Sequence, residues 1–148
     1  MRATRKKNQG GNAIIEFAIC SFFLWLSFSG VYGVGYGLYV YNSLMTSVSN
    51  AAVFGAARNY DTASPDSYTT AVKNMVVYGD ATAGTYPLVP NLTTDNVNIA
   101  LNPTTGTPQD LTVSITGYTI DSIFMSFSLS GKPKATVLYT GHIVCASC

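Results

Sequence analysis

The hydrophobic pattern of the chain is dominated by one long apolar stretch near the N-terminus. From Phe17 to Tyr41 no residue is charged, and most residues are apolar. A helix over residues 17–41 would be roughly 37 Å long, and the hydrocarbon core of a bilayer is about 30 Å thick. The pattern therefore predicts a membrane-spanning helix. Tyrosines recur near its outer end, as in the aromatic belts of membrane–water interfaces, at positions 32, 36, 39 and 41.

Beyond Tyr41 the pattern changes to that of an amphipathic helix. Leu44, Val48 and Ala51 follow helical spacing, with polar residues between them. We therefore expect one helix over residues 12–58, roughly 70 Å long. Its first half would lie in lipid, and its second half would lie under an outer domain.

Residues 59–148 predict a small outer domain that begins with a short helix. Ser64 is a suitable N-cap for this helix, and Pro65 follows at the first helical position. Gly79 suits the end of the helix. Residues 80–95 are interrupted by glycine and proline and are expected to form a loop.

Alternating apolar residues in the second half of the domain predict strands. Residues 97–101 and 111–115 predict two strands, and a third is expected from about 135 to 144, after a turn at residues 131–133. The apolar stretch 122–129 suits either a strand or a hydrophobic patch that faces a partner or the membrane surface. The expected fold class is α+β: a long N-terminal transmembrane helix, one short helix and an antiparallel sheet of about three to four strands. So small a domain has a marginal core, which the long helix is expected to complete.

The charged residues predict the orientation of the span. They make up only 10% of the chain, against about 25% in a typical domain. Four basic residues precede the span and predict a cytoplasmic N-terminus, namely Arg2, Arg5, Lys6 and Lys7. A secretory signal peptide has an apolar region of about 7–15 residues, so the longer run here disfavours one. A plain signal-anchor remains an alternative.

One carboxylate, Glu16, lies at the start of the apolar run and is the only charged residue from Asn8 to Ala57. An ionised carboxylate is costly in a membrane and tends to be paired. Cleavage between Gly11 and Asn12 would create an α-amine with a pKa near 8. That amine could pair with Glu16 of a neighbouring, staggered subunit.

These residues resemble the start of a type IV prepilin. A short basic leader ends at Gly11, and Glu16 and Phe17 follow at the fifth and sixth positions of the processed chain. The stretches GGNAIIEFAI and AAVFGAAR are similar to two motifs of the TadE/TadG-like pilus-assembly proteins, and the short chain is more TadE-like. The second motif has one extra residue, and the proline that is common in the family's anchor is missing.

The resemblance implies a pilin-like minor pseudopilin of a tight-adherence (Flp, type IVc) pilus system in the bacterial inner membrane. Its leader, residues 1–11, would be removed by a prepilin peptidase. The helix 12–58 would then assemble, through Glu16 and Phe17, with other pilins or pseudopilins, further copies of itself and the assembly platform, while 59–148 lie outside. An uncleaved, membrane-anchored accessory protein that recruits pilus or secretion components is the alternative.

Removal of the leader would change the charge of the chain. From Asn12 onward there are four basic and seven acidic residues, so the formal net charge becomes −3 instead of +1. The basic leader therefore indicates topology and processing, and no nucleic-acid partner is expected. Within the span, Ser29, Gly33 and Gly37 repeat at every fourth position. Small residues at this spacing predict helix packing against another subunit, although a merely glycine-rich anchor has the same pattern.

Cys145 and Cys148 form a C-x-x-C motif near the C-terminus. Outside the cytoplasm they could close a disulfide ring, or stay as two thiols. A thiol oxidoreductase is disfavoured because its motif normally opens a helix, and a zinc site is disfavoured because His142 is the only further ligand nearby. No catalytic triad, carboxylate pair or phosphate loop is apparent, so we expect no enzyme, metal or cofactor.

Overall fold

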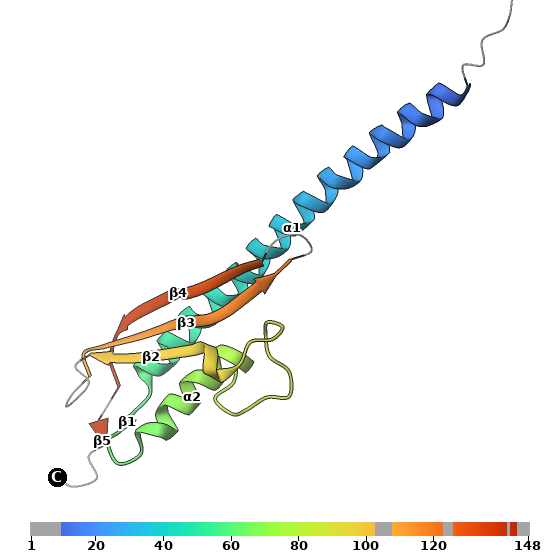
Figure 1. Ribbon diagram of the computed structural model, residues 1–148. Helices are drawn as coiled ribbons and strands as arrows, with labels where there is room; N and C mark the ends of the chain where they lie inside the picture. The colour runs from blue at the N-terminus through green and yellow to red at the C-terminus, as the bar shows by residue number, and fades with distance from the viewer. Residues whose placement is uncertain (1–9, 103–107, 123–125, 142, 145–148) are drawn as a thin grey trace, which may run out of the picture.

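The fold, from a computed structural model, combines a long N-terminal helix with a small domain packed along its C-terminal half (Figure 1). The structure describes residues 10–102, 108–122, 126–141 and 143–144. Helix α1 runs from Gly10 to Ala57, and a second helix, α2, from Pro65 to Tyr78. With a three-stranded antiparallel sheet, this is the expected α+β, pilin-like layout.

Helix α1 is continuous over 48 residues, so it is about 72 Å long. The predicted range 12–58 is thus confirmed to within one turn, and the four glycines between Gly30 and Gly37 do not interrupt the helix. The C-terminal half of α1 buries Val40, Leu44 and Val48 in the domain. The other half projects away from it (Figure 1).

Helix α2 begins and ends where the sequence predicts. Pro65 is its first residue, and Gly79 adopts the left-handed conformation, with φ at 75°, that suits glycine. The Gly79 N–H donates to the Met75 carbonyl oxygen at 3.1 Å and so closes the last turn. Ser64 flanks the helix as expected, but its side chain makes no capping hydrogen bond.

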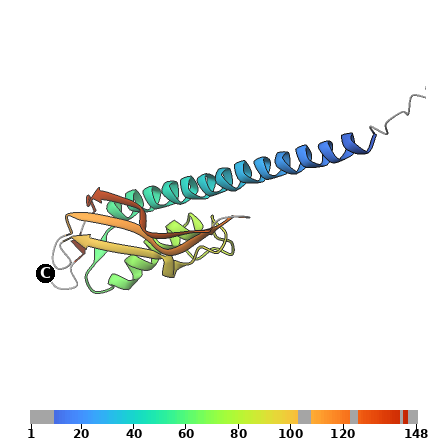
Figure 2. The same ribbon diagram turned by 45° about the horizontal axis from the view of Figure 1, so that its top comes forward.

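The sheet has the order β2-β3-β4, formed by Val97–Asn102, Asp110–Asp121 and Ser126–Leu138. Val97 pairs with Ile115 and Leu101 with Leu111, which confirms the first two predicted strands and their antiparallel pairing. Both helices cover the same face of the sheet (Figure 2). The residues between the buried positions of β2 point to solvent on the other face.

The third predicted strand, 135–144 after a turn at 131–133, is wrong in its bounds. Strand β4 begins at Ser126 and continues through Gly131 and Pro133 to Leu138. A proline is tolerated there because β4 lies at the edge of the sheet, where an N–H can be spared. Residues 126–129, which the sequence left open between strand and patch, belong to this strand.

A two-stranded sheet and a short 3-10 helix were not expected. Strand β1 (Tyr60–Asp61) pairs in parallel with β5 (Ile143–Val144), and a short 3-10 helix, η1, spans Thr94–Asn96. The register of β3 shifts around Gly117, whose φ is 68°. The Asn96 amide donates to the carbonyl oxygens of Thr116 and Gly117 at 3.3 and 3.1 Å, and so holds this irregularity.

One hydrophobic cluster connects α1, α2 and the sheet. It contains Val40, Leu44 and Val48 of α1 together with residues of α2 and the inner face of the sheet. The long helix therefore completes the core, as the sequence predicts. The fully buried members from the other elements are Val72, Val76, Val77, Leu111, Val113 and Ile115.

Candidate functional site

The N-terminal half of α1 is the largest uncovered apolar surface of the described residues. Its window of highest hydropathy has a mean value of 1.9 and contains no buried residue, so α1 is long and apolar enough to span a membrane. Phe17 and Trp25 are 75% and 73% exposed. Soluble monomers rarely expose a continuous apolar patch of more than a few hundred Å². This surface therefore fits lipid or the helices of other subunits.

Glu16 lies in the exposed first part of α1, four residues after Asn12. Residues four apart are neighbours on a helix surface, so an amine freed at Asn12 would also lie one turn from Glu16 of its own chain. The bond between Gly11 and Asn12 lies in the first turn of α1, and an added Cβ at Gly11 would meet no other atom within 4 Å. The leader residues 1–9 lie outside the described residues.

The stripe of Ser29, Gly33 and Gly37 turns partly toward the chain's own sheet. The Ser122 hydroxyl donates to the Gly33 carbonyl oxygen at 3.1 Å, and a Cβ on Gly33 would lie 3.0 Å from that hydroxyl oxygen. Gly37 borders an apolar groove beside Phe127. Gly33 thus admits the close approach of Ser122, whereas a Cβ on Gly37 would meet no atom within 4 Å. Packing of this stripe against a second subunit stays a prediction.

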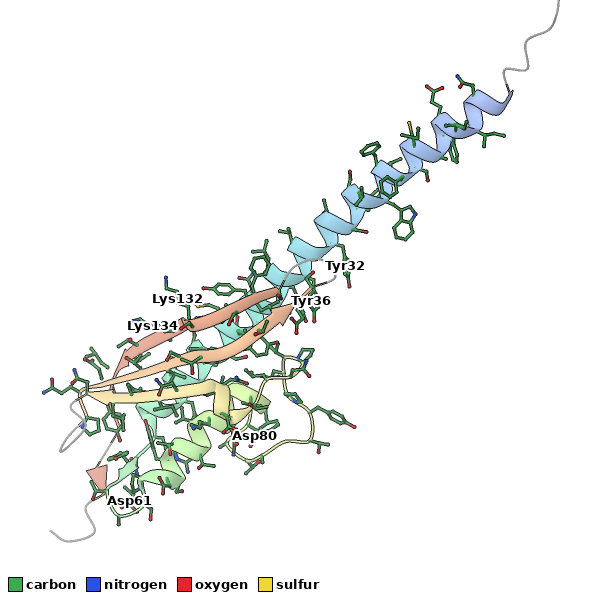
Figure 3. The ribbon with its side chains drawn as sticks, in the orientation of Figure 1. Tyr32, Tyr36, Asp61, Asp80, Lys132 and Lys134 are labelled. Carbon is green, nitrogen blue, oxygen red and sulfur yellow. The ribbon has the colours of Figure 1, made fainter. Side chains whose placement is uncertain are left out.

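Tyr32 and Tyr36, two of the tyrosines near the outer end of the predicted span, lie beside the end of β3. They stack with their ring centroids 6.4 Å apart and their planes 12° from parallel (Figure 3). Together with Asp121 and Ser122 they line a small open pocket whose surface is partly polar and partly apolar. The two rings therefore pack against each other on the side of α1 that faces the end of β3.

The second family-like motif, AAVFGAAR, covers the C-terminal end of α1, which lies inside the domain. The last carbonyl groups of a helix have no partner within it. Here the Ala56 carbonyl oxygen accepts from the backbone N–H groups of Thr140 and Gly141 at 2.9 and 2.8 Å. The Arg58 carbonyl oxygen accepts from the Tyr139 hydroxyl at 2.8 Å. The segment after β4 therefore caps the helix, which sequence reasoning missed because the residues are far apart in the chain.

Gly55 is the point at which α1, α2 and β3 meet. The Tyr68 hydroxyl donates to the Gly55 carbonyl oxygen at 2.7 Å. A Cβ on Gly55 would lie 2.5 Å from Leu111 Cδ2 and 3.0 Å from Val72 Cγ2. Burial, and to a lesser degree the nearby Tyr139 and Tyr60, raise the pKa of Tyr68 well above its usual range. The glycine of the motif therefore has a packing role.

The fold does not test the predicted disulfide or the role of the histidine. Cys145, Cys148 and His142 lie outside the described residues, so the disulfide stays a prediction. Over the described ranges, no group of three or more His, Cys, Asp or Glu side chains is placed to hold a metal ion. Cys20 is exposed on the anchor.

No protein-family model, curated protein or solved structure matches this chain. The likeness to the TadE/TadG-like proteins therefore rests on the residues of the two motifs. The fold adds the pilin-like arrangement of a long apolar helix and a small antiparallel sheet.

Proposed function

We propose that the chain is a minor pseudopilin of a tight-adherence pilus system, anchored in the bacterial inner membrane with its domain outside. One observation carries the proposal: a single helix is buried in the domain from Val40 onward and exposed and apolar before it. Such a helix holds the domain rigidly to a surface that either lipid or neighbouring helices can cover.

The exposed half of α1 suits a subunit whose helix leaves the lipid bilayer and packs against the helices of other subunits. Lipid tails are as apolar as the side chains of the span, so helix association in a membrane depends on close packing and on polar pairs. Transfer of α1 from lipid to a helical bundle would thus have a small net cost. Its direction would be decided by packing and by the one charged residue, Glu16.

Glu16 is the residue proposed to drive that association. A carboxylate at the centre of a membrane helix costs about 2.5–3.5 kcal/mol, and less near the interface. Pairing with the freed amine of Asn12 in a neighbouring subunit would remove most of this cost. A charge-assisted hydrogen bond is worth about 1.5–3 kcal/mol, so its loss would lower the assembly equilibrium roughly tenfold or more.

An uncleaved accessory protein is the second candidate function, and one observation favours it. The bond between Gly11 and Asn12 is helical, so a peptidase would have to unwind the first turn of α1 to reach it. First turns fray readily, which keeps cleavage accessible. In the accessory protein, α1 would act only as an anchor and the outer domain would recruit pilus or secretion components.

The N-terminal residue of the chain isolated from its native membrane distinguishes the two functions. We expect intact mass and N-terminal peptides to begin at Asn12. A chain that begins at Met1 would refute processing and leave the accessory role.

The second step compares three substitutions of Glu16 in cells that build the pilus. Glu16→Ala and Glu16→Gln should lower incorporation roughly tenfold or more while membrane levels stay normal, and Glu16→Asp, which keeps the charge, should restore part of it. Equal incorporation of all three variants would refute the proposed role of the charge.

A further inference from the structure

The end of β3 and the start of β4 reach back along α1 into the predicted membrane span. Ser122 contacts Gly33, and Gly33 lies roughly 24 Å along the helix axis from Phe17. Figure 3 shows the end of β3 and the start of β4 beside Tyr32 and Tyr36. Part of the folded domain therefore lies alongside the span, not beyond its outer end.

Glu16 indicates where the hydrocarbon region begins. If its carboxylate lies at the inner boundary, a hydrocarbon core of about 30 Å ends near residue 37 of α1. Ser122 is then about 6 Å inside the outer boundary. Ile120 and Phe127 pair two residues farther from the hairpin end, and so lie near the boundary itself.

An apolar groove of about 280 Å³ opens at this level between α1 and the hairpin. Its exposed surface is wholly apolar. On the helix side, Val34 and Leu38 are 49% and 58% exposed, so the groove continues into the uncovered face of the span. On the sheet side, Phe127 is 47% exposed. The remaining lining residues are Gly37, Tyr41, Ile120 and Leu129.

We infer that residues 120–122 and 126–129, at the adjoining ends of β3 and β4, form a second membrane-contact element, and that the groove holds an acyl chain of an outer-leaflet phospholipid. Continuity with the span and the lack of polar surface favour a lipid chain over water. A separate pocket is lined by Tyr32 and Tyr36 of α1 together with Asp121 and Ser122. The inference requires that α1 spans the membrane, but it does not depend on pilus assembly.

Tryptophan fluorescence in vesicles tests this contact, because Trp25 is the only tryptophan of the chain. The vesicles contain phosphatidylcholine and phosphatidylglycerol, with bromine on the acyl chains either near the glycerol backbone or near the methyl end. In a Trp25→Phe, Phe127→Trp chain we expect strong loss of fluorescence with bromine near the glycerol backbone. Little loss is expected with bromine near the methyl end.

Two controls show where the quenching occurs and whether α1 is inserted in the bilayer. Leu138→Trp in the same background puts the probe at the far end of β4, where residue 138 is 71% exposed, and it should keep its fluorescence. Trp25 of the unaltered chain should be quenched, which shows that α1 is inserted. If Trp25 is quenched and the tryptophan at 127 is not, the inference is overturned.

A pair of glycine substitutions tests occupancy of the groove itself. A Cβ at Gly37 or at Gly35 would meet no atom within 4 Å, but only Gly37 lines the groove. In the Phe127→Trp chain, Gly37→Phe should reduce the quenching, and Gly35→Phe should leave it unchanged. Equal quenching in both would overturn the acyl-chain site. Quenching that rises as the protein is diluted in lipid would instead assign the groove to a second copy.

Native mass spectrometry gives a measurement that needs no substitution. The unaltered chain should retain phospholipid after detergent exchange. A chain that is free of lipid under these conditions would overturn the proposed site.

Discussion

Replacement of Gly55 by alanine is the most direct test of the close contact between α1, α2 and β3. The added methyl group would lie 2.5 Å from Leu111 Cδ2 and 3.0 Å from Val72 Cγ2, well inside normal carbon–carbon contact. Both neighbours are fully buried, and the valine is restricted at χ1. The three elements therefore have little room to adjust.

Two opposing effects set the size of the change. Overpacking a core by one methyl group typically costs about 1–3 kcal/mol. Alanine is the better helix former by up to about 1 kcal/mol, which offsets part of that cost. We expect Gly55→Ala to lower the free energy of unfolding by roughly 1–2 kcal/mol, which corresponds to a melting temperature lower by roughly 5–10 °C.

The assay is thermal unfolding of the full chain in a mild detergent, followed by near-ultraviolet circular dichroism of its tyrosines. Leu111→Val removes the side-chain end that clashes most, so Gly55→Ala should cost less in that background than alone. A melting temperature that is unchanged or raised by Gly55→Ala would refute the tight packing at this position.

Two further predictions concern the hydrogen-bonding side chains of Tyr68 and Asn96. Burial raises the pKa of Tyr68 in the folded state, so its protonated hydroxyl stabilises the fold. This contribution to the free energy of unfolding is fully present below the pKa of about 10 that tyrosine has in the unfolded chain, and it is lost as pH rises toward the higher pKa of the folded state. Tyr68→Phe should therefore weaken the loss of stability above about pH 10, as measured by unfolding against pH. The exposed Tyr86→Phe should not. Asn96→Ala removes the two bonds to the β3 irregularity together with the two that Thr93 donates to the Asn96 side-chain oxygen, and should cost about 1–2 kcal/mol in the same thermal assay. The exposed Asn98→Ala should be nearly neutral, and equal melting temperatures for both asparagine variants would contradict this role.

The elements that the sequence predicts correctly are those fixed by local chemistry. Pro65 and Gly79 bound α2 through backbone conformations that depend on the residue itself. The alternation in residues 97–101 and 111–115 similarly identifies which face of β2 and β3 is buried. The apolar length of α1 is also local, and so its span could be predicted.

Features that depend on distant partners could not be predicted in the same way. Gly131 and Pro133 usually indicate a turn, but pairing with β3 at the sheet edge keeps them in β4. The capping of Ala56 by Thr140 joins residues 84 positions apart. For the candidate site, the exposed anchor was predictable, whereas the contact of Gly33 with the chain's own hairpin was not.

Mechanically, α1 is a single rigid helix with no break at which it could bend. It passes unbroken from the exposed span into the core, and it contains none of the prolines that most often kink a helix. Its last turn is clamped by the hydrogen bonds to Ala56. A pull or a twist applied to the domain is therefore transmitted along α1 to Glu16 with little slack, so displacement of the domain also displaces the exposed N-terminal half of the helix.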